Sequence, residues 1–150
     1  MNPDLIITFG TGIVKPYIFN ASKWGTINIH RGQIDKYRGL DSDLWAIKNE
    51  DFDNIGVAIH YVDEDLDTGD VLSTGKVSLS KVDEIYHLKY HTTILATNMM
   101  LEVLKKFKQK GGKIKGESQT EFGEYYTAMS LEEKHLTEDI FNDYKLYDNE

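Results

Sequence analysis

The chain has 150 residues, of which 17 are basic and 25 are acidic, giving a formal net charge of -8 at pH 7. This length supports one compact domain with its own core, and the acidic balance argues against nucleic acid as a main partner. There is no cysteine, which excludes disulfide bonds and thiolate metal sites.

The first predicted elements are two short strands and two helical segments. Residues 5–9 (LIITF) form an apolar run without alternation, which is typical of a strand covered on both faces of a parallel sheet by flanking helices. Pro16 is expected to open a short helical turn, and residues 26–30 (TINIH) to form a second strand. Asp41 or Ser42 can then cap a helix that continues to Asn49.

A hairpin and a long helix are expected next. Residues 55–63 and 70–79 are two β-rich runs joined by a tight acidic loop, which predicts a β-hairpin. From Ser80 to Phe107, apolar residues recur every three or four positions. This spacing predicts one amphipathic helix, ended by the glycine pair that follows it.

The last part of the chain, residues 113–150, is predicted to contain one helix. Ser130 and Glu133 have the spacing of a capping box for a helix that runs toward Leu146. The order of elements predicts an α/β fold on a mixed, mostly parallel sheet with flanking helices. No run approaches the ~20 apolar residues of a membrane span, and the first residues lack the pattern of a secretory signal, so we expect a cytoplasmic protein without a membrane partner.

Three polar side chains are candidates for chemistry. Asn28 and His30 end the second predicted strand and share one face of it, and Asp67 lies in the hairpin loop. A carboxylate can fix the tautomer of an imidazole, and an amide can hold an oxyanion by a hydrogen bond. The alternative is structural, with Asn28 as a turn former, His30 as a packed histidine and the acidic loop as a solvated turn.

The segments "PDLIITFGTGIVKP", "INIHRGQIDKYRGLDSDLWAI" and "NIGVAIHYVDEDLDTGDVL" together resemble the second half of the catalytic domain of folate-dependent formyltransferases. This family includes the glycinamide ribonucleotide, methionyl-tRNA and amino-sugar enzymes. The resemblance implies that residues 1–112 are the C-terminal half of that domain, lacking its N-terminal nucleotide-binding half, and that residues 113–150 extend the same unit. It also implies a formyl donor, 10-formyltetrahydrofolate, and a primary amine as acceptor.

The resemblance assigns roles to individual residues. Asn28, His30 and Asp67 match the catalytic Asn-x-His and loop Asp of the family, with a protonated His30 as an expected oxyanion donor beside Asn28. Two loops are expected to hold the folate, largely through backbone groups: Gly10, Thr11, Gly12 and Ile13 in the first, and Val62, Asp63, Glu64, Asp65 and Thr68 in the second. The residues expected near the acceptor are Arg31, Tyr37, Arg38 and Gly39.

Departures from the family pattern affect the acceptor and the assembly. Residues 31–35 replace a Pro-Ser-Leu-Leu-Pro segment, and Arg31 could contact a small, phosphate-bearing acceptor. Because the family's first strands have no counterpart before residue 5, we expect a homo-oligomer or a companion N-terminal half. His60 is assigned to packing, and no metal is expected. The alternative functions are a formyltetrahydrofolate hydrolase and an inactive remnant that serves as a binding module.

Overall fold

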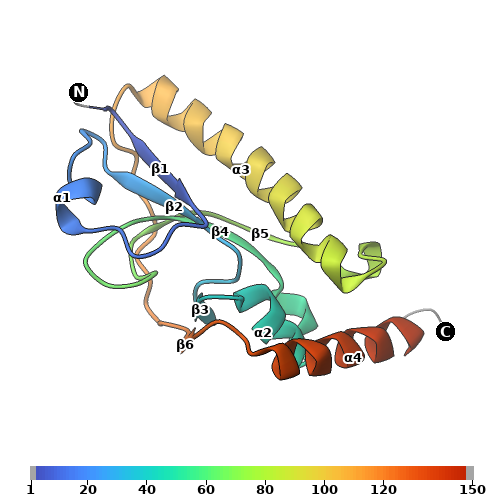
Figure 1. Cartoon of the computed structure of the whole chain (residues 1–150). Helices are drawn as coiled ribbons and strands as arrows, with labels where there is room; N and C mark the ends of the chain where they lie inside the picture. Colours follow the sequence, from blue (N-terminus) through green and yellow to red (C-terminus); the bar gives the residue numbers. More distant parts are fainter. Residues whose placement is uncertain (1–2, 148–150) are drawn as a thin grey trace.

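The computed structural model describes residues 3–147. Its main sheet has the strand order β1-β2-β4-β5, formed by Ile6–Phe9, Thr26–His30, Gly56–Tyr61 and Val71–Lys76. The β1–β2 pair is parallel, whereas β2–β4 and β4–β5 are antiparallel (Figure 1). The α/β class, the mixed sheet and the hairpin are thus confirmed. Parallel pairing is a smaller part of this sheet than expected, because a tight hairpin can only join antiparallel strands.

A second, two-stranded sheet pairs β3 (Tyr37–Gly39) in parallel with β6 (Glu124–Tyr126). The sequence patterns predicted no strand in either segment. Arg38 supports the pairing, because its Nε donates a hydrogen bond to the Gly123 carbonyl at 2.6 Å. The small sheet brings the polar segment that follows the long helix α3 (Leu88–Lys110) close to Asn28 and His30.

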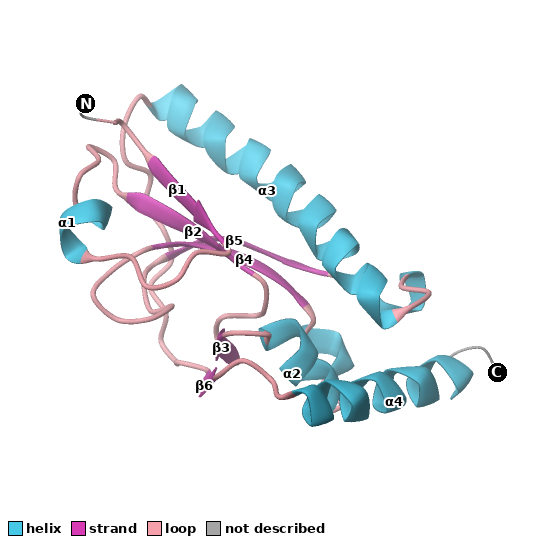
Figure 2. Ribbon diagram, in the orientation of Figure 1, coloured by secondary structure: helices cyan, strands magenta, loops and turns pink. Residues whose placement is uncertain are grey.

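The helices lie on both sides of the main sheet and at one end of it (Figure 2). The expected helices α1, α2 and α4 are confirmed as Pro16–Phe19, Ser42–Lys48 and Leu131–Tyr147. The capping box of α4 is also present, since the Glu133 N–H donates to Ser130 Oγ and the Ser130 N–H donates to Glu133 Oε2. None of the helices within residues 3–147 has the length and apolarity that a membrane span requires.

The long helix α3 is Leu88–Lys110, so its expected start near Ser80 is wrong. The chain before it forms two 3₁₀ turns, η2 (Leu79–Lys81) and η3 (Ile85–His87), separated by Val82 in an extended conformation. A further 3₁₀ turn, η1, spans Phe52–Asn54. Because 3₁₀ turns also repeat every three residues, their apolar positions continue the helical period in the sequence without being part of the helix.

The main sheet has one apolar face, which packs against α3, and one polar face. Ile27 and Ile59 pack with Met100, Val103 and Phe107 of α3 in one buried cluster, and Figure 1 shows α3 running beside the sheet. A second cluster joins α2, α4 and the segment before α3, with members Ala46, Ile47, Leu79, Val82 and Phe141. Since side chains alternate along a strand, Asn28 and His30 point away from the face that α3 covers.

Strand β1 differs from the expectation of a strand covered on both faces. Within the described residues it pairs only with β2, and Ile7 and Phe9 remain 44% and 38% exposed. Thr8, which points to the other face, is buried. Within the described residues β1 is therefore an edge strand, and its apolar side chains form a surface that residues 3–147 do not cover.

Candidate active site

The polar face of the sheet borders a cavity of about 1420 Å³. Its walls come from the ends of β1 and β2, the loop after each of these strands, the β4–β5 loop and the first turns of α2 and α3. The cavity is lined by these expected site residues: Gly10, Thr11, Gly12, Ile13, Asn28, His30, Arg31, Arg38, Gly39, Val62, Asp63, Glu64, Asp65, Asp67 and Thr68. Ligand pockets commonly measure ~300–1,000 Å³, so this cavity has room for more than one small molecule.

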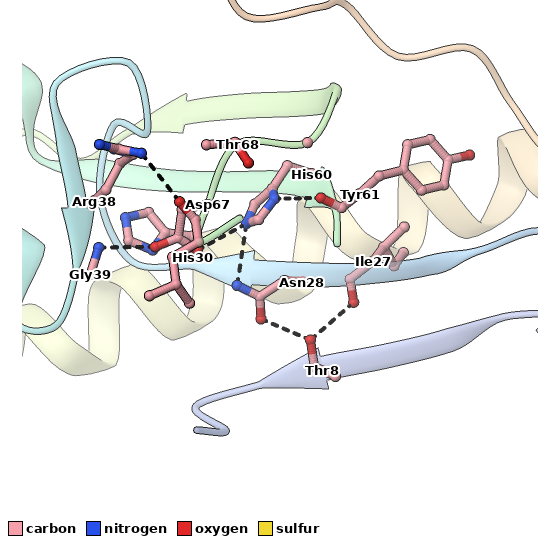
Figure 3. Close-up of polar contacts among 12 residues, drawn as sticks. Thr8, Ile27, Asn28, His30, Arg38, Gly39, His60, Tyr61, Asp67 and Thr68 are labelled. Carbon is pink, nitrogen blue, oxygen red and sulfur yellow. Dashed lines mark hydrogen bonds and ion pairs between the residues drawn. The ribbon is translucent and has the colours of Figure 1, made fainter. Parts of the chain in front are cut away.

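Three neighbouring strands place Thr8, Asn28 and His60 in one row across the sheet. Thr8 is opposite Asn28 in the β1–β2 register, and Asn28 is opposite His60 in the β2–β4 register. The Thr8 hydroxyl donates to Asn28 Oδ1 at 2.9 Å, and Asn28 Nδ2 lies 3.3 Å from His60 Nε2 (Figure 3). These contacts fix the Asn28 amide with its oxygen toward β1 and its nitrogen toward β4.

Asp67 reaches the same row from the hairpin loop. Its backbone is in the left-handed region, with φ at 55°, a conformation that Asp adopts more readily than most residues. The Gly39 N–H donates to Asp67 Oδ2 at 2.9 Å, and Gln119 Nε2 donates to the Asp67 carbonyl at 3.2 Å. Asp67 is thus held by the small sheet and by the segment that follows α3.

Two imidazole rings flank the Asp67 carboxylate. His30 Nδ1 lies 3.6 Å from Oδ2, and His60 Nε2 lies 3.5 Å from Oδ1. The other nitrogens are close to carbonyl oxygens, His30 Nε2 to Tyr37 at 2.7 Å and His60 Nδ1 to Tyr61 at 2.8 Å. Because a carbonyl only accepts, these two nitrogens carry the N–H groups. In neutral rings, the nitrogens that face Asp67 are therefore the unprotonated ones.

Burial and the neighbouring opposite charges shift the pKa values of His30 and Asp67 in opposite directions. The pKa of His30 is lowered, mainly by burial, although the nearby Asp67 carboxylate opposes this effect. Burial would raise the pKa of Asp67, but the contacts with His60, His30 and the Gly39 N–H outweigh it and lower this pKa to about 2. The low pKa of Asp67 keeps its carboxylate ionised at neutral pH, whereas burial favours the neutral form of His30.

Comparison with known proteins identifies the family. The model of the formyl transferase family matches residues 1–104. The chain belongs to this family. A methionyl-tRNA formyltransferase from Caldanaerobacter subterraneus is 30% identical over 89% of this formyl transferase chain and 42% of its own length. Another from Kosmotoga olearia is 28% identical over 100% of the chain and 50% of its own length.

Two solved structures with a bound tetrahydrofolate have a similar fold. The formyltransferase PseJ from Anoxybacillus kamchatkensis, in complex with UDP-4,6-dideoxy-4-formamido-L-AltNAc and tetrahydrofolate, is 30% identical with a TM-score of 0.72. That match covers 88% of the chain and 67% of PseJ. HypX from Aquifex aeolicus, in complex with tetrahydrofolic acid, is 25% identical with a TM-score of 0.69, over 94% of the chain and 26% of HypX. The formyl transferase chain spans half or less of the two curated relatives described above.

Tyr37 is the one expected site residue of this formyl transferase chain that does not line the cavity. Its ring is 5% exposed, stacks on Tyr126, and its hydroxyl donates to Asp51 Oδ2 at 3.1 Å. The β3–β6 pairing turns the Tyr37 side chain into the core, away from the cavity. Only the Tyr37 carbonyl, which orients His30, takes part in the site.

Two members of the polar row formed by Thr8, Asn28 and His60 were not predicted as site residues from the sequence, namely Thr8 and His60. His60 was assigned to packing, and it is 2% exposed, but it also contacts both Asn28 and Asp67. The sequence signal was a histidine alternating with apolar residues in β4, and only the strand register shows which side chain it meets. Within residues 3–147 of the formyl transferase chain, no group of His, Asp and Glu side chains is arranged to hold a metal ion.

Proposed function

We propose that the chain transfers a formyl group from 10-formyltetrahydrofolate to a primary amine. The observation that carries this proposal is the cluster of Asn28, His30, His60 and Asp67 at the wall of a cavity with room for two ligands. Family membership and tetrahydrofolate in the PseJ and HypX structures support the choice of donor.

In this mechanism, Asn28 stabilises the oxyanion. The amine nitrogen attacks the formyl carbon, and the carbonyl oxygen becomes negative in the tetrahedral intermediate. Asn28 Nδ2 has two hydrogens, and His60 Nε2 accepts only one of them. The second is available to the formyl oxygen, a contact of the kind that contributes ~3 kcal/mol in other oxyanion holes.

Asp67 and its two histidines handle the proton. The attacking amine must lose a proton, and the departing folate nitrogen must gain one. The Asp67 carboxylate lies 3.6 Å from His30 Nδ1 and 3.5 Å from His60 Nε2, so its negative charge stabilises a proton that reaches either imidazole. The cluster can therefore store the proton between the two steps and return it to the folate.

The folate is held by the two loops named above. Residues 10–13 and 62–68 both line the cavity, and Thr68 Oγ1 donates to Asp63 Oδ1 at 2.7 Å, which shapes the second loop. Such loops offer mainly backbone N–H and C=O groups, which suit the edge of a pterin ring. Because this second loop also carries Asp67, a folate bound to it would lie next to Asn28 and His60.

A small, phosphate-bearing amino sugar is the acceptor class that we favour. The ligand in the PseJ structure is a UDP-linked formamido sugar, and Arg31, Arg38 and Gly39 of this chain line the same cavity as Asn28. A net charge of -8 disfavours a tRNA, whose binding needs many phosphate contacts.

The test is a transfer assay with the wild-type chain, 10-formyltetrahydrofolate and a panel of primary amines that includes UDP-amino sugars. We expect tetrahydrofolate to appear together with an N-formyl product that mass spectrometry detects. Formate release without any amine would instead indicate a hydrolase. Failure to bind tetrahydrofolate in calorimetry would contradict both reactions and favour a binding module.

A second copy of the chain or a companion N-terminal half is the expected partner at β1. Ile7 is 44% exposed on a strand whose outer edge no described residue pairs, and such edges associate readily. We expect the wild-type chain to self-associate in light scattering and Ile7→Lys to shift it toward monomer. Leu136→Lys, at an equally exposed position of α4, is the control and should change nothing. A monomeric wild type with full transfer activity would contradict this proposal.

A further inference from the structure

Two further charged residues, Arg31 and Asp43, line the cavity outside the cluster of Asn28, His30, His60 and Asp67. Arg31 directly follows β2, and Asp43 is in the first turn of α2. Gly32 brings the two segments together, because a Cβ built on it would lie 2.7 Å from Ser42 Cβ and 2.9 Å from His30 Nε2. Both charged residues line the cavity that holds Asn28 and His30.

Arg31 is held in place without an anionic partner among residues 3–147. Its guanidinium lies 4.5 Å from the centre of the Phe9 ring, and its Nη2 donates to Thr93 Oγ1 at 3.1 Å. Its Nε is buried and has no hydrogen-bond partner among the described residues. A guanidinium fixed by an aromatic ring and a hydroxyl keeps its capacity to bind an anion.

Asp43 is a buried carboxylate without a cationic partner in direct contact. It is 9% exposed, and the Leu44 N–H donates to its Oδ1 at 3.0 Å. Among residues 3–147 no side chain donates a hydrogen bond to it and no ion pair joins it to Arg31, although the field of Arg31 acts on it. Burial raises the pKa of Asp43 to about 6, so its ionised form is costly until a cation pairs with it.

We propose that Arg31 and Asp43 are the two poles of the acceptor subsite, where Asp43 binds the amino group of an amino sugar as its ammonium form and Arg31 binds the anionic group. The inference rests on the proposed formyl transfer and adds a basis for acceptor choice. The ammonium passes one proton to the Asp43 carboxylate before the neutral amine attacks, and the amine nitrogen loses its second proton through the Asp67 cluster to the departing folate nitrogen. The formamide product is neutral. Asp43 therefore favours the substrate over the product, which assists product release. Lys89 lines the same cavity and lies one helical turn before Thr93, the residue that Arg31 contacts, so it adds positive charge on the Arg31 side.

The inference is tested by calorimetry with two probes, a UDP-linked 4-amino-4,6-dideoxy sugar and its neutral N-acetyl derivative. The wild type is expected to bind the amine more tightly than the N-acetyl compound. Asp43→Asn should remove this preference and weaken the binding of the amine by about tenfold or more, as loss of a buried charge pair predicts. Arg31→Gln should weaken the binding of both probes to the same extent. Asp53→Asn, an exposed carboxylate on η1, is the matched control and should resemble the wild type.

Two further measurements separate this inference from the proposed function. Asp43→Asn should bind tetrahydrofolate like the wild type and should unfold at an equal or higher temperature, because a costly buried charge has been removed. The inference is overturned if the wild type binds tetrahydrofolate but neither probe, or if Asp43→Asn keeps the preference for the amine. A lower unfolding temperature of Asp43→Asn would also overturn it, since Asp43 would then be structural. Absence of tetrahydrofolate binding in the wild type would reject the formyl transfer itself.

Discussion

Asp67→Asn and His30→Ala are each expected to reduce the rate of formyl transfer by roughly 10²–10³-fold, the range seen when one oxyanion or proton-transfer group is removed from other enzymes. Asp67 is in contact with both histidines, and His30 has no other carboxylate partner in the described structure. Either change therefore disrupts the same proton-transfer cluster of Asp67 and its two histidines. The double variant should lose little more than either single variant, because groups that act as one unit are not additive.

Steady-state kinetics on the single and double variants measure this coupling, and calorimetry with tetrahydrofolate shows whether the donor still binds. His60→Ala is a useful comparison. It removes one of the two imidazoles and the acceptor that orients the Asn28 amide, so a slower reaction with tetrahydrofolate binding retained is expected. Fully additive losses, or a His30→Ala variant with unchanged turnover, would remove His30 from the mechanism.

Gly39→Ala is expected to damage both the fold of the small sheet and the site. Gly39 has φ at 92°, and an added Cβ would collide with the carbonyl oxygen of Tyr126, its partner across β3–β6. The dihedral strain alone costs roughly 1–3 kcal/mol of folding free energy. Because the Gly39 N–H also anchors Asp67 Oδ2, displacement of this backbone should lower turnover in the remaining folded protein.

Thermal unfolding and single-turnover assays of Gly39→Ala test both effects. The matched control is Gly112→Ala, since an added Cβ there meets nothing within 4 Å and Gly112 lies outside the site. The control should retain the wild-type unfolding temperature and rate. If Gly39→Ala also behaved like the wild type, the backbone at Gly39 would not be what positions Asp67.

The sequence by itself determined most of the secondary structure and the candidate loops. β2, the hairpin and α4 follow from local signals, namely strand-length β-rich runs, turn residues and the Ser130–Glu133 capping box. These signals act between residues close in sequence, so they need no tertiary information. The resemblance to formyltransferases similarly placed Asn28, His30 and Asp67 by their order and context in the chain.

Which side chains meet, and how deeply each is buried, depends on the tertiary structure. His60 joins the site because β4 pairs antiparallel to β2 with His60 opposite Asn28, and Tyr37 leaves it because β3 pairs with β6. His30 favours the neutral form because burial lowers its pKa. Strand register, long-range pairing and desolvation depend on residues that are distant in the sequence, and no local pattern contains them.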